Sequence, residues 1–437
     1  MRILRLVGTV LGTTLVLTAT APVAQADARP ATKASESPLN GGTLDGAALN
    51  SGLRAVHDAG MYGVYSSVRD GSERWTGAAG VADVDTGRPV RPGMLHRVGS
   101  VSKAFTSVAL LQQVERGRLR LDAPIGDYLP ALVPGERGRE ITVRMLLNHT
   151  SGIGDYVVGA FPSLAHGSTA SLDEDRFRSI RPEELVRLGL AAPATGKPGE
   201  KWSYSNTNYV IAGLLLEKLT GQDAEAYITR HVIARAGLHH TSFPRTPYIQ
   251  GPHARMYDSF YGLINPPRDY SDYDMSWAYT AGALVSTTDD LNRFYRALLG
   301  GKLIGPAALR EMQRTVPTGD GANYGLGIYS VDFRGCGRFW GHDGAVFGAG
   351  TLVYSSPDGK RQVAMGWNLM KYERLKSDGT GFEDSPIDDA LNRQVVRALC
   401  PTTPPAPPAE SHSATAPPRT VLPTVDLAPG AWAKALR

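Results

Sequence analysis

The chain has 437 residues, of which 42% are hydrophobic, which is enough for an ordinary core and for two or three structural units. Its 46 lysine and arginine residues nearly balance 42 acidic residues, so the formal charge of +4 is small for this length. The basic residues are scattered among acids, which excludes the basic surface typical of nucleic-acid-binding proteins. Composition therefore predicts a soluble globular protein with no nucleic-acid partner.

The first residues have the pattern of a secretory signal peptide. Arg2 and Arg5 precede an apolar run over residues 6–17, and residues 24–26 have the small-x-small pattern of a cleavage site. A membrane anchor is the alternative, but the apolar run is too short to span a bilayer comfortably. We therefore predict a signal peptide over residues 1–26 and a secreted, extracellular protein without a stable membrane anchor.

The next residues, 27–42, are rich in Ala, Pro, Ser and Gly and predict a flexible lead-in. Helical spacing and then strand-like alternation follow. The expected elements are a helix over 44–56 with Thr43 as its N-cap, strands over 62–69 and 73–78 joined by a turn at Asp70-Gly71, and a strand over 81–84.

A serine and a lysine three positions apart precede the next apolar run. The run from Val108 to Val114 predicts a helix whose first turn carries Ser100 and Lys103. Residues i and i+3 share a helix face, so the lysine amine can reach the serine hydroxyl. A neighbouring base activates serine as a nucleophile, and N–H groups at a helix N-terminus can hold an oxyanion. A single Ser-x-x-Lys is expected by chance in a chain this long, so the match needs supporting context.

The middle of the chain, residues 121–277, has helices and long loops. The tripeptide Tyr204-Ser205-Asn206 lies on the loop that enters one of the helices. A tyrosine near a lysine ammonium can have a lowered pKa and shuttle protons, and an amide can hold the carbonyl side of a substrate. Taken alone, the tripeptide is better explained as a helix cap. The expected elements are helices over 143–147 and 209–219, a surface excursion over 154–179, and a Tyr-rich loop over 246–276 that either rims a site or packs on the surface.

The last third returns to β-structure. His342-Asp343-Gly344 follows an aromatic strand, and Gly344 allows close backbone approach, so that the Ala345 N–H could be a second oxyanion donor beside that of Ser100. An ordinary turn is the alternative. The expected elements are a helix over 289–299, strands over 324–331, 338–340, 351–354 and 362–367 with a turn at 357–359, and a helix over 387–399 capped by Ser385.

This order of elements predicts an α/β architecture in which terminal helices cover one face of a sheet and an all-α domain is inserted. The predicted domains are an α/β domain from 43–103 and 281–400, and a mainly helical domain over 104–280. Residues 401–437 are rich in Pro and Ala and predict a disordered tail that maturation could remove. The two cysteines, Cys336 and Cys400, most simply form a disulfide in an exported protein, and two unpaired buried thiols are the alternative.

The three motifs together resemble the serine β-lactamase and penicillin-binding protein superfamily, which includes class C β-lactamases and D-alanyl-D-alanine carboxypeptidases. The chain is most similar to the exocellular carboxypeptidase branch, over nearly all of residues 43–400, and the placement of its cysteines resembles that branch's disulfide. The stretches that add to the match are 146–152, 198–221, 276–278, 281–291, 324–327 and 341–344.

The resemblance implies a β-lactamase/DD-peptidase-like fold and a two-step acyl transfer. The scattered histidines, without a His-Glu-x-x-His motif, predict that no metal is needed, and no cofactor is expected. Ser100 would attack a carbonyl while Lys103 and Tyr204 relay its proton. The implied substrate-binding residues are Asn206, Trp277, His342, Asp343, Gly344 and Ala345. The implied substrate is a small peptide, ester or β-lactam, and a peptidoglycan stem peptide fits this class.

Two departures from the branch bear on the substrate. Asp343 stands where the branch has Thr, and the position of an arginine that would clamp a terminal carboxylate is Tyr329 or Ser330 here. Arg334 and Arg338 are the cations that could substitute. An added acid and a lost cation should repel a free carboxylate, which favours a neutral ester, amide or amidated peptide.

The predicted function is a secreted serine hydrolase, most similar to D-alanyl-D-alanine carboxypeptidases, with an esterase or β-lactamase of the same superfamily as alternatives. The sequence lacks the Gly-x-Ser-x-Gly of α/β-hydrolases and the His-Glu-x-x-His of zinc proteases. The non-enzyme alternative is a pseudoenzyme that binds peptide or β-lactam without turnover. Such a protein would keep binding after Ser100→Ala.

Overall fold

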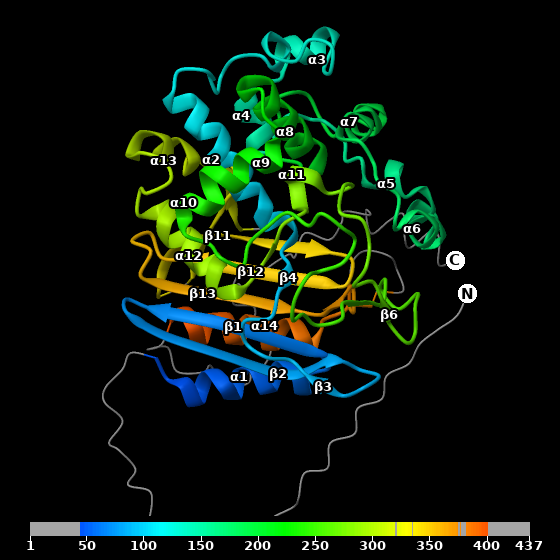
Figure 1. Ribbon diagram of the computed structural model, residues 1–437, viewed down its shortest axis with the longest axis vertical. Helices are drawn as coiled ribbons and strands as arrows, with labels where there is room; N and C mark the ends of the chain where they lie inside the picture. Colours follow the sequence, from blue (N-terminus) through cyan, green and yellow to red (C-terminus); the bar gives the residue numbers. More distant parts are fainter. Residues whose placement is uncertain (1–43, 320, 334, 375, 377–381, 401–437) are drawn as a thin grey trace, which may run out of the picture. The chain divides into compact units, whose positions relative to one another are not determined.

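The computed structural model describes residues 44–319, 321–333, 335–374, 376 and 382–400 (Figure 1). The predicted signal peptide, lead-in and tail, together with Thr43 and Arg334, lie outside the described residues. The boundaries predicted between an α/β and a helical domain stay a prediction.

Among the described residues, the main sheet has nine strands in the order β3-β2-β1-β13-β12-β11-β10-β9-β8, and all its pairings are antiparallel. The N-terminal hairpin joins the C-terminal strands where β1 pairs with β13, with Val64 opposite Trp367. The strands are β1 Gly63–Asp70, β2 Glu73–Asp83, β3 Arg88–Pro89, β8 Val316–Pro317, β9 Asn323–Tyr324, β10 Tyr329–Phe333, β11 Gly337–Val346, β12 Ala349–Ser355 and β13 Arg361–Trp367.

Two small sheets lie beside the main one. The strand order β14-β5-β6 joins β14 Leu369–Met370, β5 Tyr257–Asp258 and β6 Arg268–Asp269, and the other sheet pairs β4 His96–Arg97 with β7 Val285–Ser286. The second pair matters for the site because β4 leads directly into the segment that carries Ser100.

The terminal helices α1 Gly46–Asp58 and α14 Pro386–Leu399 pack on each other and on one face of the main sheet (Figure 1). Side chains alternate along the strands, as pleating requires. Thus Leu352 and Tyr354 of β12 join the core under α14, whereas Val353 joins the core on the other face. The predicted cover of one sheet face by the terminal helices is confirmed.

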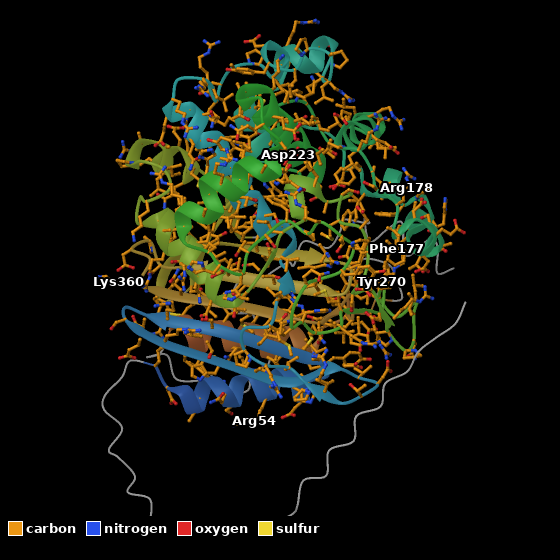
Figure 2. The ribbon with its side chains drawn as sticks, viewed as in Figure 1. Arg54, Phe177, Arg178, Asp223, Tyr270 and Lys360 are labelled. Atoms are coloured by element: carbon orange, nitrogen blue, oxygen red, sulfur yellow. A yellow bond between two sulfur atoms is a disulfide. The ribbon has the colours of Figure 1, made fainter. Side chains whose placement is uncertain are left out.

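The other helices pack on the opposite face of the sheet and on one another, with side chains filling the space between them (Figure 2). The 3₁₀ and π turns are η1 Gly99–Val101, η2 Ile125–Asp127, η3 Pro162–His166 and η4 Thr229–Ile233. The α-helices are α2 Ser102–Glu115, α3 Gly135–Glu140, α4 Val143–Leu147, α5 Val157–Ala160, α6 Ala170–Asp175, α7 Pro182–Ala191, α8 Asn206–Thr220, α9 Ala224–Ile228, α10 Ala234–Ala236, α11 Tyr279–Gly282, α12 Thr288–Leu299 and α13 Pro306–Met312.

Several predicted elements need correction. The first helix is capped by Asp45, whose side chain accepts from the Ala48 N–H. The strand predicted over 324–331 is two strands, β9 and β10, because the chain turns at residues 325–328. The predicted surface excursion over 154–179 contains α5, η3 and α6, and Phe161 in it is fully buried.

The predicted disulfide is present and joins Cys336, between β10 and β11, to Cys400 at the end of α14, with Cα atoms 5.7 Å apart. The bond ties the end of α14 to the turn between β10 and β11. Within the described ranges, we find no helix with the length and apolar character that crossing a membrane requires.

Candidate active site

Ser100 lies in η1, two residues before α2 begins, and is 7% exposed. Lys103, in the first turn of α2, is fully buried and donates to Ser100 Oγ at 2.9 Å. The predicted i and i+3 contact is therefore present, although the serine sits in a 3₁₀ turn and not in the α-helix itself. The short turn presents the hydroxyl at the N-terminal end of α2, where backbone N–H groups lack intrahelical acceptors.

The Lys103 amine has three acceptors, which fix its position. Besides Ser100, it donates to Asn206 Oδ1 at 2.8 Å and to the backbone oxygen of Ala281 at 2.8 Å. Burial lowers the pKa of Lys103 from 10.5 to about 7, against the opposing effect of Asp155 and Asp343. A substantial fraction of this amine is therefore neutral near pH 7 and can accept a proton from Ser100.

Tyr204 lies on the loop before α8, and its hydroxyl donates to Ser100 Oγ at 2.7 Å. The Lys103 ammonium lies 4.8 Å from the centre of the tyrosine ring, as the sequence motif suggested. The expected lowering of the tyrosine pKa is wrong, however, because burial raises the pKa of Tyr204 well above its usual value. Tyr204 therefore keeps its proton near neutral pH, and Lys103 is the better candidate for a base.

Asn206 begins α8 and links the lysine to an acid that the motifs did not identify. Its side-chain Nδ2 and backbone N–H both donate to Asp155 Oδ2, at 2.8 and 2.7 Å. This pairing fixes the amide so that its oxygen faces Lys103. Burial raises the pKa of the Asp155 carboxyl.

Strand β11 runs close beside η1, and two glycines permit this approach. A Cβ on Gly344 would lie 2.0 Å from the Val98 oxygen and 3.0 Å from the Ser100 nitrogen. A Cβ on Gly99, whose φ is +53°, would lie 2.8 Å from the Ala345 nitrogen. The backbone N–H groups of Ser100 and Ala345 are thus on neighbouring segments, as an oxyanion hole requires.

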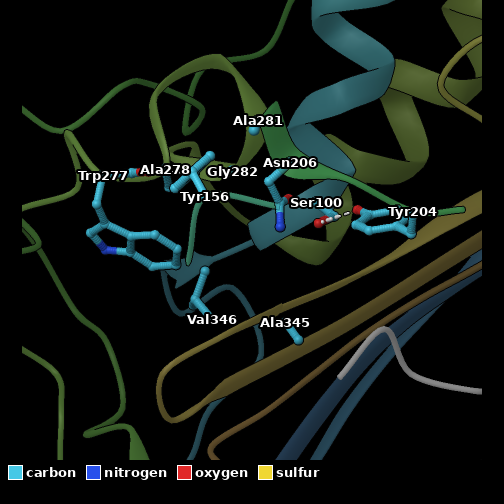
Figure 3. Close-up of a pocket in the computed structure, with 10 residues that line it drawn as sticks. All are labelled: Ser100, Tyr156, Tyr204, Asn206, Trp277, Ala278, Ala281, Gly282, Ala345 and Val346. Carbon is cyan, nitrogen blue, oxygen red and sulfur yellow. Dashed lines mark hydrogen bonds between the residues drawn. The ribbon is translucent and has the colours of Figure 1, made fainter. Parts of the chain in front are cut away.

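A pocket opens beside Ser100, with about 360 Å³ of empty space that includes open solvent. Trp277 forms one wall and is 6% exposed, while Ala345 and Val346 of β11 form another (Figure 3). The full lining is Ser100, Tyr156, Tyr204, Asn206, Trp277, Ala278, Ala281, Gly282, Ala345 and Val346.

His342, Asp343 and Gly344 lie on β11, the strand that forms one wall of the pocket, but they are not among the residues that line it. His342 is fully buried behind the site and shares a 2.9 Å hydrogen bond with the Tyr324 hydroxyl through Nε2. Asp343 is 2% exposed, and its Oδ1 lies 3.4 Å from His342 Nδ1. Gly344 matters for the approach of β11, and Ala345 is the residue of this motif that reaches the pocket.

Sequence reasoning missed Asp155, Tyr156 and the backbone oxygen of Ala281. Tyr156 is fully buried against the pocket, and its hydroxyl donates to the Trp277 backbone oxygen. The signal in the sequence was the acid and the aromatic residue, Asp155 and Tyr156, that closely follow the turn Thr150-Ser151-Gly152. Only their contacts with distant parts of the fold reveal their role. In the described part of the chain, no cluster of three or more His, Cys, Asp or Glu side chains is arranged to hold a metal ion.

Comparison with known proteins supports this reading of the geometry. A family model described as Beta-lactamase matches residues 53–384. The putative penicillin-binding protein PbpX of Bacillus subtilis (strain 168) is 27% identical over 341 residues, which are 78% of this chain and 77% of the relative. Esterase EstB of Burkholderia gladioli is 34% identical over 210 residues, 46% of this chain and 53% of the esterase.

Solved structures agree on the fold. A D-stereospecific amidohydrolase from Streptomyces sp. superposes with a TM-score of 0.71 at 34% identity, covering 82% of this chain and 100% of that chain. The D-amino acid amidase from Ochrobactrum anthropi SV3 has a TM-score of 0.67 at 23% identity, over 81% of this chain and 97% of that chain, which bears on the fold alone.

Proposed function

Because the chain belongs to the Beta-lactamase family, we propose that it is a hydrolase that forms an acyl-enzyme on Ser100 and cleaves uncharged amides or esters of small D-amino-acyl compounds. The amidohydrolase and esterase names of two relatives support this choice of substrate class.

The observation that carries the proposal is the charge of the pocket. Its lining is Ser, Tyr, Asn, Trp, Ala, Gly and Val, without a cationic side chain. Tyr329 and Ser330, at the positions that match the clamping arginine, are buried in β10, and Arg338 pairs with Asp332 at 2.9 Å. With Asp343 and Asp155 near Lys103, a substrate carboxylate would meet negative charge and find no cationic side chain among the described residues that line the pocket.

The contacts support a specific order of proton movements. Neutral Lys103 takes the Ser100 proton as Oγ bonds to the substrate carbonyl carbon, and the N–H groups of Ser100 and Ala345 stabilise the oxyanion. The protonated Tyr204 is placed to give its proton to the leaving amine or alcohol, and Lys103 restores it. Water then adds to the acyl carbonyl and gives its proton to neutral Lys103, and the bond to Ser100 Oγ breaks as Oγ takes that proton back from Lys103, which releases the acid.

The test compares three substrates that share one D-amino-acyl group: its amide, its methyl ester, and a peptide that ends in a free D-alanyl carboxylate. We expect kcat/KM for the amide or ester to exceed that for the carboxylate by at least about tenfold, since each unpaired charge costs more than 1.4 kcal/mol. Ser100→Ala should abolish every turnover. Equal or faster cleavage of the carboxylate would rule out the proposed preference.

A carboxypeptidase acting on cell-wall peptides is the second candidate, favoured by the match to a putative penicillin-binding protein over 78% of the chain. Fluorescent penicillin separates the candidates. Stable labelling of Ser100 indicates a slowly deacylating peptidase-like site, whereas rapid destruction of the drug indicates a β-lactamase. Absence of both, with ester cleavage that needs Ser100, favours the proposed hydrolase.

We also propose that the protein is exported. The pattern of residues 1–26 and the disulfide between Cys336 and Cys400 support this location, since disulfides persist in oxidising compartments. Intact-mass analysis of protein collected outside the cells should show loss of the first 26 residues. Retention of these residues in protein that stays in the cytoplasm would contradict export.

A further inference from the structure

The turn Phe347-Gly348 joins β11 to β12 directly after Ala345 and Val346, the two β11 residues that line the pocket (Figure 3). The turn is itself buried, with Phe347 fully inaccessible to solvent. Its backbone therefore needs partners from other parts of the chain, and what holds it also sets the position of the pocket wall.

A buried ion pair contacts both residues of this turn. Asp258 ends β5 and Lys371 follows β14, and the Lys371 ammonium donates to Asp258 Oδ2. The same carboxylate oxygen accepts the Gly348 N–H at 3.1 Å. The Lys371 ammonium lies 5.0 Å from the centre of the Phe347 ring, within the range of a cation–π contact.

The turn also contacts one wall of the pocket and is continuous with the other. The Phe347 ring lies 5.2 Å from the Trp277 ring, which forms the aromatic wall. On the other side, Ala345 lies two residues before the turn and faces Gly99 and Ser100. The ion pair is therefore one contact from the aromatic wall and a few backbone bonds from the second oxyanion donor.

The local backbone supports a positional role. Lys371 has a φ of +48°, which is strained for a residue with a side chain. Asp258 is fully buried and Lys371 is 4% exposed, and such pairs often give no more stability than apolar residues of similar size. A strained backbone and a buried ion pair at one place are therefore better explained by the position in which they hold the turn than by a gain in stability.

We propose that Asp258 and Lys371 are positioning residues of the active site. They hold the β11–β12 turn so that the Ala345 N–H stays beside that of Ser100 and Trp277 keeps the width of the acyl pocket. The kinetic consequences rest on the proposed hydrolase function, whereas the structural consequence, a rigid turn, does not.

The decisive variant removes both charges at once. Asp258→Asn/Lys371→Met leaves no lone buried charge, so its thermal stability should stay within a few degrees of the parent protein. The matched control is Asp70→Asn/Arg361→Met, which removes a 2.7 Å ion pair between β1 and β13 in the same sheet, outside the residues that line the pocket.

Two readouts separate positioning from stability. Deuterium exchange of a peptide covering residues 343–350 should quicken in the test variant and stay unchanged in the control. The kcat/KM for an aromatic D-amino-acyl ester should fall at least tenfold, and the ratio of rates for aromatic and small acyl groups should change at least threefold. Unchanged exchange, or faster exchange with unchanged kinetics and ratio, would overturn the proposal.

If the double variant does not fold, Asp258→Asn and Phe347→Leu replace it. The first keeps an acceptor for Gly348, and the second removes the ring between Lys371 and Trp277 while the ion pair stays. Both should change the acyl preference in the same direction, and unchanged preference in both overturns the inference. Should the parent protein cleave no substrate, the hydrolase proposal fails, and the exchange of residues 343–350 still decides the positioning role.

Discussion

The Lys103 amine lies 2.9 Å from Ser100 Oγ, and burial lowers its pKa to about 7. The ammonium form cannot accept the serine proton, so kcat/KM should rise with pH, with an apparent pKa about 7, and level off above it. Initial rates from pH 5 to 9 on the neutral ester check this. A flat profile across that range is incompatible with Lys103 as the base.

The same shift links this residue to stability. The folded-state pKa is below the value of 10.5, so the unfolded chain binds more protons between about pH 7 and 10.5. The contribution of Lys103 to the free energy of unfolding therefore rises with pH through that window and is lowest below pH 7. The site keeps a reactive amine at the expense of stability near neutral pH.

Asp343 raises the pKa of Lys103 by its negative charge, although it does not reach the pocket. Asp343→Thr should therefore lower that pKa, and the acid limb of the rate profile should move to lower pH by a few tenths of a unit to about one unit. Asp332→Asn is the control, because this exposed acid pairs with Arg338. A shift to higher pH in Asp343→Thr would contradict the electrostatic assignment.

The Tyr204 hydroxyl should be needed for chemistry and not for folding. Tyr204→Phe keeps the ring but removes the 2.7 Å hydrogen bond to Ser100, and we expect kcat/KM to fall about 10²- to 10⁴-fold with little change in melting temperature. The comparison is Tyr295→Phe, another buried tyrosine whose hydroxyl has no hydrogen-bond partner within the described structure. Similar losses in both variants would remove the special role of Tyr204.

At the level of elements, the spacing of residues in the sequence predicted the contacts between residues that are close together in the chain. Ser100 and Lys103 are three residues apart, and the helix geometry alone brings them together. Tyr204 is 104 residues from Ser100, and only the resemblance to a family placed it there. Asp155 had neither source of information, since it meets Asn206 from a segment 51 residues away.

The errors in the predicted elements also come from contacts between segments that are far apart in the sequence. The strand predicted over 324–331 breaks because Gly327, with a φ of +81°, packs against α2, where a Cβ would lie 3.0 Å from the Lys103 oxygen. The motifs predict a lysine ammonium near Tyr204, which would lower the pKa of the tyrosine. In the fold, burial has the larger effect on this pKa and raises it. Burial and close approach between distant segments are not encoded in periodicity.

The approach of β11 to η1 should be intolerant of even one added methyl group. Gly344→Ala would place a Cβ 2.0 Å from the Val98 oxygen, so the two segments must separate, and we expect kcat/KM to fall at least about 10²-fold as one oxyanion donor is lost. Gly46→Ala on α1 is the control, because its nearest neighbour would be the Trp75 side chain at 3.3 Å. Retention of full activity in Gly344→Ala would show that Ala345 is not a donor.

At the scale of the whole molecule, the disulfide should affect stability and not catalysis. Cys336→Ser/Cys400→Ser removes a link between residues 64 positions apart, for which the chain-entropy model gives a loss of about 4 kcal/mol in the free energy of unfolding. The melting temperature should fall by several degrees, and kcat/KM at 25 °C should be unchanged because neither cysteine lines the pocket. An unchanged melting temperature would mean that the bond adds little.

The strand order of the main sheet also sets a timetable for its assembly. The Ser66 hydroxyl on β1 bonds to the Ala364 oxygen on β13, a partner that is 298 residues later in the chain. At ribosomal speeds of 5–20 residues per second, β1 waits about 15 to 60 seconds for that partner to be made. The hairpin of β1 and β2 presents an open edge throughout this interval, so a chaperone that covers it should raise the yield of folded protein more than one that acts on the completed chain.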